Sequence, residues 1–74
     1  MPKLPIISGK ELIKVLNKIG YEIDHQTGSH IILRNREVPY RRLTVPNHKV
    51  LAKGTLLAIT KQAGLTRDEF FKLL

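Results

Sequence analysis

The chain has 74 residues, with 13 Lys or Arg against 6 Asp or Glu, which gives a net charge of +7. Its 42% hydrophobic content excludes a disordered chain, and no apolar run approaches the roughly 18 residues of a membrane span. It contains no cysteine, which excludes disulfides, thiolate metal sites and cysteine nucleophiles.

The first ten residues lack the apolar stretch of a signal peptide, so we expect an intracellular, cytoplasmic protein without a membrane partner. The length predicts a single domain over residues 1–74. The positive charge points to a polyanionic partner, most economically a nucleic acid, although an acidic protein would satisfy the same charge balance.

The first predicted element is a helix that begins near Ser8. Ser8 and Glu11 have the spacing of a capping box. Apolar residues follow at helical spacing from Leu12 to Ile19, and Gly20 offers the left-handed stop that ends helices. This pattern predicts an amphipathic helix with lysines on its outer face.

Alternation of apolar and polar residues then predicts three short antiparallel strands. The first begins at Tyr21 and includes Ile23, and residues 25–28 form the turn that follows it. The second strand begins at His30, and the third covers residues 41–45.

Helical spacing returns after the third strand. Apolar residues at positions 52, 56, 59 and 63 predict a second helix that ends at Gly64, and Thr66 with Glu69 predicts a short capped helix at the C-terminus. The predicted fold class is α+β in the order α-β-β-β-α with an extra terminal helix. A three-stranded antiparallel sheet carries both long helices on one face, and its other face is open.

Side-chain alternation also predicts which residues share the open face. If Ile23 pairs with Ile31 on the covered side, Asp24 lies opposite His30 on the open side, a register that one bulge would change. The same alternation places further residues on the open face: Ile32, Arg34, Arg42 and Thr44.

The positive charge is concentrated between residues 34 and 53, where six basic residues and one acid give a local balance of +5. This stretch is either a solvated basic surface or a phosphate-binding one. At the start of the second helix, free backbone N–H groups and the helix dipole would attract a phosphate, although Gly54 and Thr55 would equally well only begin the helix. The candidate phosphate-binding residues are Arg34, Arg42, Lys49, Lys53, Gly54 and Thr55.

Three histidines are the candidates for acid–base chemistry near neutral pH. His25 falls in the predicted turn and is most simply a solvated polar residue, and His48 most simply serves the structure of its loop. His30 lies on the open face near arginines, although an exposed strand histidine is more often a surface residue than a catalyst. The three are too scattered to predict a metal site.

Several short motifs along the chain resemble one family. They are Ser-Gly-Lys-Glu-Leu at 8–12, Gly-Ser-His at 28–30, Val-Pro-Asn-His at 45–48 and Lys-Gly-Thr-Leu at 53–56. Together, over about residues 8–71, this series resembles the HicA-type toxins.

This resemblance implies a fold like that of the double-stranded RNA-binding domain and the activity of a type II toxin, an endoribonuclease that cleaves mRNA. It implies His30 as the catalytic residue, no metal or other cofactor, and neutralisation by a HicB-type antitoxin. Candidate supporting residues are Asp24, Ser29 and His48. The hypothesis for the reaction is metal-independent cleavage that leaves a 2′,3′-cyclic phosphate.

Two alternatives stay open from the sequence. A non-catalytic RNA-binding module would need the same fold and basic residues but would give His30 no chemical role. A small basic interaction protein would direct its charge at an acidic partner instead of RNA.

Overall fold

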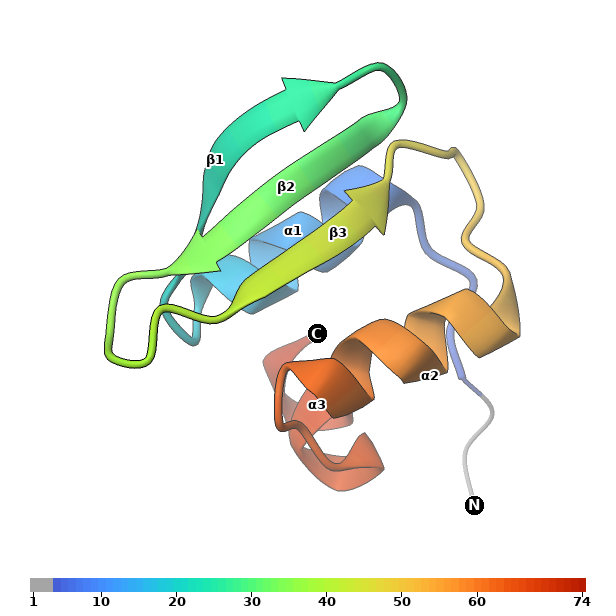
Figure 1. The fold of residues 1–74 in the computed structure, drawn as a ribbon. Helices are drawn as coiled ribbons and strands as arrows, with labels where there is room; N and C mark the ends of the chain where they lie inside the picture. Colours follow the sequence, from blue (N-terminus) through green and yellow to red (C-terminus); the bar gives the residue numbers. More distant parts are fainter. Residues whose placement is uncertain (1–3) are drawn as a thin grey trace.

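The computed structural model describes residues 4–74, and residues 1–3, the start of the predicted domain, lie outside the described residues. The chain folds in the order α-β-β-β-α-α (Figure 1). This order confirms the predicted α+β fold with its extra terminal helix. The elements are α1 (Gly9–Asn17), β1 (Tyr21–Thr27), β2 (His30–Asn35), β3 (Arg42–Pro46), α2 (Lys53–Gln62) and α3 (Arg67–Leu73).

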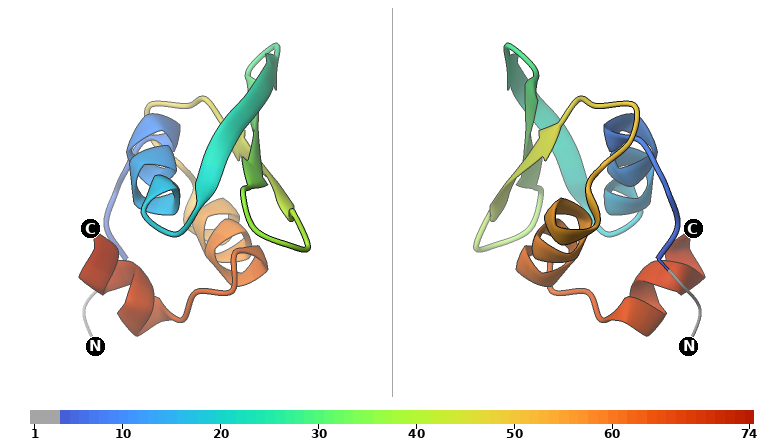
Figure 2. Two further views of the ribbon diagram at one scale, coloured as in Figure 1. Left: turned by 90° about the vertical axis from the view of Figure 1, so that its left-hand side faces the viewer. Right: turned by 90° about the vertical axis from the view of Figure 1, so that its right-hand side faces the viewer.

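The three strands form one antiparallel sheet in the order β1-β2-β3. Along β2 and β3 every second side chain is buried, and Leu33 and Val45 are completely so. Helices α1 and α2 both lie on the side of the sheet that these residues face (Figure 2). The prediction that both long helices cover one face is therefore confirmed.

Both predicted capping boxes are present. The Ser8 hydroxyl accepts a hydrogen bond from the Glu11 backbone N–H at 3.1 Å, and the Glu11 carboxylate accepts one from the Ser8 N–H at 3.1 Å. Thr66 and Glu69 repeat this exchange at the start of α3. Each box satisfies two of the N–H groups that a helix start leaves without intrahelical partners.

Helix α2 begins differently from the other two helices. Its N-cap is Ala52, which makes no side-chain cap bond and is exposed, so the apolar residues that the spacing places on one side of this helix do not form a buried stripe from position 52. The buried residues of α2 are Leu56, Ile59 and Thr60. The stripe starts later because the helix itself starts at Lys53, one turn before its first core contact.

The turn between β1 and β2 lies later than predicted. Residues 25–27 are strand, and the chain reverses over Gly28 and Ser29 alone, so that Thr27 pairs with His30. Gly28 has a φ of +58°, and glycine at the first position of a two-residue turn is the pattern of a type II′ hairpin. The predicted four-residue turn is wrong because this glycine allows a tighter reversal.

A β-bulge changes the predicted strand register. Ile23 pairs with Leu33 instead of Ile31, the next paired residue is His25, and Asp24 is the extra residue between them. Tyr21 is the buried residue of β1, and Ile23 is 59% exposed. The end of the β1–β2 hairpin extends past the helices (Figure 2), and residues 22–30 are all exposed.

Two backbone hydrogen bonds join the start of α1, the loop after β3 and the hairpin turn. The Gly9 N–H donates to the His48 carbonyl at 2.9 Å, and the Asn47 N–H donates to the Ser29 carbonyl at 2.7 Å. The α carbon of Gly9 also lies directly against the backbone of Pro46. Glycine is required at position 9 because any side chain would enter this contact.

We expect Gly9→Ala to lower the free energy of unfolding by about 1–3 kcal/mol, the usual range for an overpacked contact. An added Cβ would lie 2.1 Å from the Pro46 carbonyl oxygen, so α1 would have to move. Urea unfolding followed by circular dichroism measures the change.

The matched control is Gly54→Ala, because nothing lies within 4 Å of an added Cβ there. This helical position should gain about 0.5–1 kcal/mol. Equal stabilities of Gly9→Ala and the wild type would contradict the described packing of α1 on β3.

Candidate functional site

The uncovered side of the sheet, called the open face below, is defined by strand pairing. Residues paired directly across two antiparallel strands share a face, and His30, Ile32 and Arg34 of β2 point away from the helices. Their partners complete the open face: Glu22, His25 and Thr27 on β1, and Arg42, Thr44 and Pro46 on β3.

His30 is the first residue of β2 and is exposed on the open face. Its neighbours across the sheet are Thr27 and Pro46, neither of which titrates. The turn before it is fixed from two directions, by Gly28 and by the bond from Asn47 to the Ser29 carbonyl. The backbone at His30 is therefore held at a defined place near the end of the sheet, and Ser29 contributes through its backbone carbonyl.

Arg34 and Arg42 lie on the same face as His30, as predicted. They are paired directly across β2 and β3 and both are exposed. The Arg34 guanidinium lies 5.0 Å from the centre of the Tyr40 ring, a cation–π contact that limits the rotation of a long side chain. These arginines are suited to bind an anion because their guanidinium groups donate hydrogen bonds in a planar fork.

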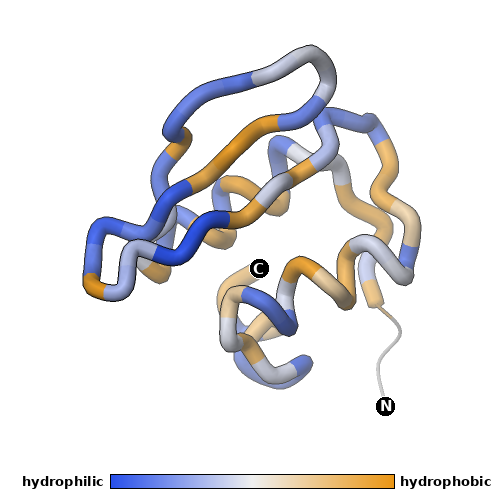
Figure 3. Tube along the Cα trace, viewed as in Figure 1, coloured by the Kyte–Doolittle hydropathy of each residue, from blue (hydrophilic) through white to orange (hydrophobic). Residues whose placement is uncertain are grey.

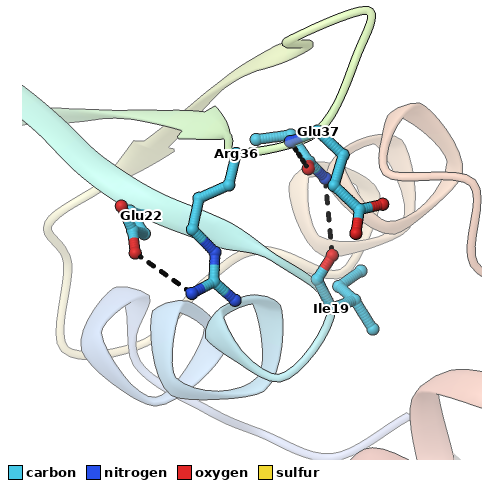
Figure 4. Close-up of polar contacts among 5 residues, drawn as sticks. Ile19, Glu22, Arg36 and Glu37 are labelled. Carbon is cyan, nitrogen blue, oxygen red and sulfur yellow. Dashed lines mark hydrogen bonds and ion pairs between the residues drawn. The ribbon is translucent and has the colours of Figure 1, made fainter.

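The loop between β2 and β3 is anchored to the start of β1 (Figure 4). The Asn35 side chain donates to the Ile19 carbonyl at 3.4 Å and accepts from the Glu37 N–H at 2.9 Å. Arg36 lies 3.5 Å from the Glu22 carboxylate, an exposed pair of small energetic value. The anchored loop positions Tyr40 beside Arg34.

A groove of about 320 Å³ lies at this end of the sheet. The chain around it is mostly hydrophilic, from the end of β2 through the loop to the start of β3 (Figure 3). Its polar lining is suited to a polar ligand. The lining residues are Glu22, Ile23, Asp24, Arg34, Asn35, Arg36 and Tyr40.

The Asp24 carboxylate forms a hydrogen bond with the side chain of His25. Its Oδ2 lies 2.7 Å from Nδ1 of His25, so the prediction that Asp24 lies opposite His30 is wrong. The bulge causes the difference, because it adds one residue to β1 between Ile23 and His25. The hydrogen bond from His25 holds the pKa of Asp24 below its ordinary value, and the positive charges of Arg42 and Arg34 act in the same direction.

The sequence pattern placed His25 in a turn and did not predict its true position. It belongs to a strand and to the open face, diagonally across from His30. The sequence did contain a signal, because Gly28 and Ser29 can form a two-residue turn that pairs Thr27 with His30. That pairing puts His25 on the same face as His30. Tyr21 faces the helices, and strict alternation would put His25 on the same side as Tyr21, so the strand must contain one extra residue between Tyr21 and His25.

The other predicted phosphate-binding residues lie outside the sheet. Helix α2 is on the covered side of the sheet, so its first turn, with Lys53, Gly54 and Thr55, belongs to the helix layer (Figure 2). Lys49 and His48 are exposed in the loop before α2 and line a groove with the start of α1. None of this group adjoins His30 in the sheet.

Two classes of site find no support in residues 4–74. No group of three or more His, Asp or Glu side chains in this range is arranged to hold a metal ion. None of the helices described there has the length and the apolar run needed to traverse a lipid bilayer.

We expect His25→Ala to raise the pKa of the Asp24 carboxyl toward its ordinary value, because the substitution removes the hydrogen bond that favours the ionised form. Titration of the carboxyl carbon by NMR measures this. The pKa of Asp24 is lower in the folded than in the unfolded chain, so its contribution to stability is present above the unfolded value and is lost as the pH falls through the folded one.

His30→Ala is the matched control and should leave the Asp24 titration nearly unchanged, because the register separates these two residues. A large shift in His30→Ala with none in His25→Ala would contradict the bulge.

Comparison with known proteins identifies the family of this chain. The family model described as the HicA toxin of bacterial toxin–antitoxin systems matches residues 9–65, well over half of the chain. A search among curated proteins finds no match. The matched range includes the sheet, α1, α2 and the histidine at the start of β2. The chain therefore belongs to the family of HicA toxins of bacterial toxin–antitoxin systems.

Proposed function

We propose that this toxin is an endoribonuclease that cleaves mRNA without a metal ion and that His30 is its catalytic residue. The observation that carries the proposal is the exposed imidazole of His30 on a sheet face that also presents Arg34 and Arg42. Membership of a toxin family supports it, because cleavage of messages is a way for so small a protein to stop growth.

The reaction needs few groups from the protein because RNA carries its own nucleophile, the 2′-hydroxyl group. A nearby imidazole that accepts the 2′-hydroxyl proton accelerates such a reaction by about 10²- to 10⁴-fold. Attack of the 2′-oxygen on the adjacent phosphorus gives a 2′,3′-cyclic phosphate and releases a 5′-hydroxyl. A shallow exposed face is sufficient for this reaction, since the substrate supplies both reacting groups.

Arg34 and Arg42 hold the RNA backbone in this proposal. Arg34 is four residues from His30 along β2, about 13 Å at the rise of a strand, so these guanidinium groups bind backbone phosphates further along the RNA and fix its position on the face. Their two phosphate contacts explain binding but carry no sequence information. Phosphate binding at the start of α2, by Lys49, Lys53, Gly54 and Thr55, stays a prediction for a more distant part of the RNA.

The partner in this proposal is a HicB-type antitoxin. An antitoxin that covers the open face would exclude RNA and would bury His30 at the same time. The half-buried Ile32, at the centre of the face and flanked by His25 and Thr44, offers such a partner an apolar contact among polar groups.

We expect the purified protein to cleave an mRNA transcript in the presence of EDTA and to leave fragments with 2′,3′-cyclic phosphate ends. His30→Ala should reduce the cleavage rate by about 10²- to 10⁴-fold, since the imidazole moves the proton. Denaturing gels give the rate, and enzymatic end analysis identifies the termini.

Circular dichroism must show that His30→Ala is folded, which its exposed position favours. If neither protein cuts RNA while both bind it equally, the chain is a binding module and the enzymatic proposal is wrong. If neither binds RNA at low salt, the charge serves an acidic partner instead. Fragments with 3′-hydroxyl ends would contradict attack by the 2′-oxygen.

Salt dependence tests the role of the arginines. In the His30→Ala background, which preserves the RNA, Arg34→Gln with Arg42→Gln should reduce the slope of log affinity against log salt by about 0.7 per lost contact with single-stranded RNA. Fluorescence anisotropy of a labelled oligonucleotide measures it. Lys61→Gln, on the exposed surface of α2, is the control for loss of charge alone. An equal effect of the control would contradict binding at the open face.

A further inference from the structure

The β-bulge brings a second histidine to the face that carries His30. If β1 had no bulge and Asp24 were paired like its neighbours, strict alternation from the buried Tyr21 would turn His25 toward the helices. Because Asp24 is instead an extra residue in the strand, His25 pairs with Ile32 on the open face, and Thr27 pairs with His30. Bulges commonly redirect side chains beside functional sites.

The two imidazoles are therefore diagonal neighbours on adjacent strands. Diagonal positions across an antiparallel pair lie roughly 7–8 Å apart, and side chains bring their ends closer. The side chains beside them, Thr27 and Ile32, do not titrate. Both imidazoles are exposed, so a phosphodiester that lies across β1 and β2 can contact one on each side.

Asp24 fixes which nitrogen of His25 is available. The ionised carboxylate accepts a hydrogen bond from Nδ1–H at 2.7 Å, which leaves Nε2 free to face a ligand. A carboxylate behind an imidazole orients the ring and fixes its tautomer. Within residues 4–74, His30 has no such carboxylate partner. The two histidines thus differ in environment, as a donor and an acceptor of protons must.

We propose that His25, oriented by Asp24, is a second catalytic residue, the general acid that protonates the leaving 5′-oxygen while His30 is the general base. This proposal rests on the ribonuclease activity proposed above and adds the group that completes the reaction. In it, Asp24 is a positioning residue and does not touch the RNA.

The reaction balances with these two groups. The 2′-hydroxyl proton passes to the free ring nitrogen of His30, and the 2′-oxygen forms a bond to phosphorus. The bond between phosphorus and the 5′-oxygen breaks, and that oxygen takes the proton from Nε2 of His25. Neutral His25 and protonated His30 return to their starting forms by exchanging protons with water. The products are a 2′,3′-cyclic phosphate and a 5′-hydroxyl.

The competing explanation is that the Asp24–His25 bond only stabilises the bulge. A substrate that needs no acid separates the two explanations. The probe is an oligoribonucleotide with a site that the wild-type protein cleaves, made in two forms that differ in one atom. One form has the natural 5′-oxygen at the scissile phosphate and the other has a bridging 5′-sulfur, which leaves as a thiolate without protonation.

We expect His25→Gln to slow cleavage of the oxygen substrate by about 10²- to 10⁴-fold and to leave cleavage of the sulfur substrate near the wild-type rate. Asp24→Asn should show the same pattern with a smaller loss. His30→Ala should be slow on both substrates, because removal of the 2′-hydroxyl proton does not depend on the leaving group. Gln62→Ala, on the exposed surface of α2, should match the wild type on both.

The outcomes separate the two proposals. If the wild type cleaves but His25→Gln is equally fast on the oxygen substrate, or is slowed equally on both substrates, His25 is not the general acid and the proposal for His30 is untouched. If His30→Ala cleaves both substrates at the wild-type rate, the function proposed for His30 fails. Circular dichroism with thermal unfolding establishes that each compared variant is folded.

Discussion

The structure depends on one packing constraint, the burial of a single face of a three-stranded sheet. Two amphipathic helices of about ten residues can cover one side of three short strands and no more. Leu33 and Val45 on the covered side lose essentially all contact with water, while the residues that alternate with them on the open face are exposed or half-buried. The open face is thus a consequence of the small size of the chain, and it is where polar chemistry can meet a large substrate.

Most of the fold could be predicted from the sequence because local and long-range preferences agree there. Ser8 and Thr66 start helices, Gly20 ends one in the left-handed region, and the apolar pattern of β2 and β3 assigns each residue to a face. The placement of His30, Arg34 and Arg42 on one face followed from that pattern. Alternation alone could not predict the register of β1. The two-residue turn sets the register at one end of the strand and the buried Tyr21 sets it at the other, and the two agree only with a bulge between them.

The charge on the open face is more balanced than the sequence suggests. β1 brings Glu22 and Asp24 close to Arg34 and Arg42, so the face combines acids and bases where a count over residues 34–53 shows mainly bases. A carboxylate near a reactive phosphate repels it. The hydrogen bond between Asp24 and His25 partly offsets this repulsion, because the imidazole N–H donates to the carboxylate. Binding of the RNA backbone therefore depends on the β2 and β3 side of the face.

The bulge at Asp24 has a second consequence, for solubility. β1 is an edge strand, and a flat edge offers a row of unpaired backbone groups on which another copy can build a continuous sheet. An extra residue breaks the spacing of that row, and the carboxylates of Glu22 and Asp24 along it repel a second identical edge. The irregularity that turns His25 outward thus also protects this strand from aggregation.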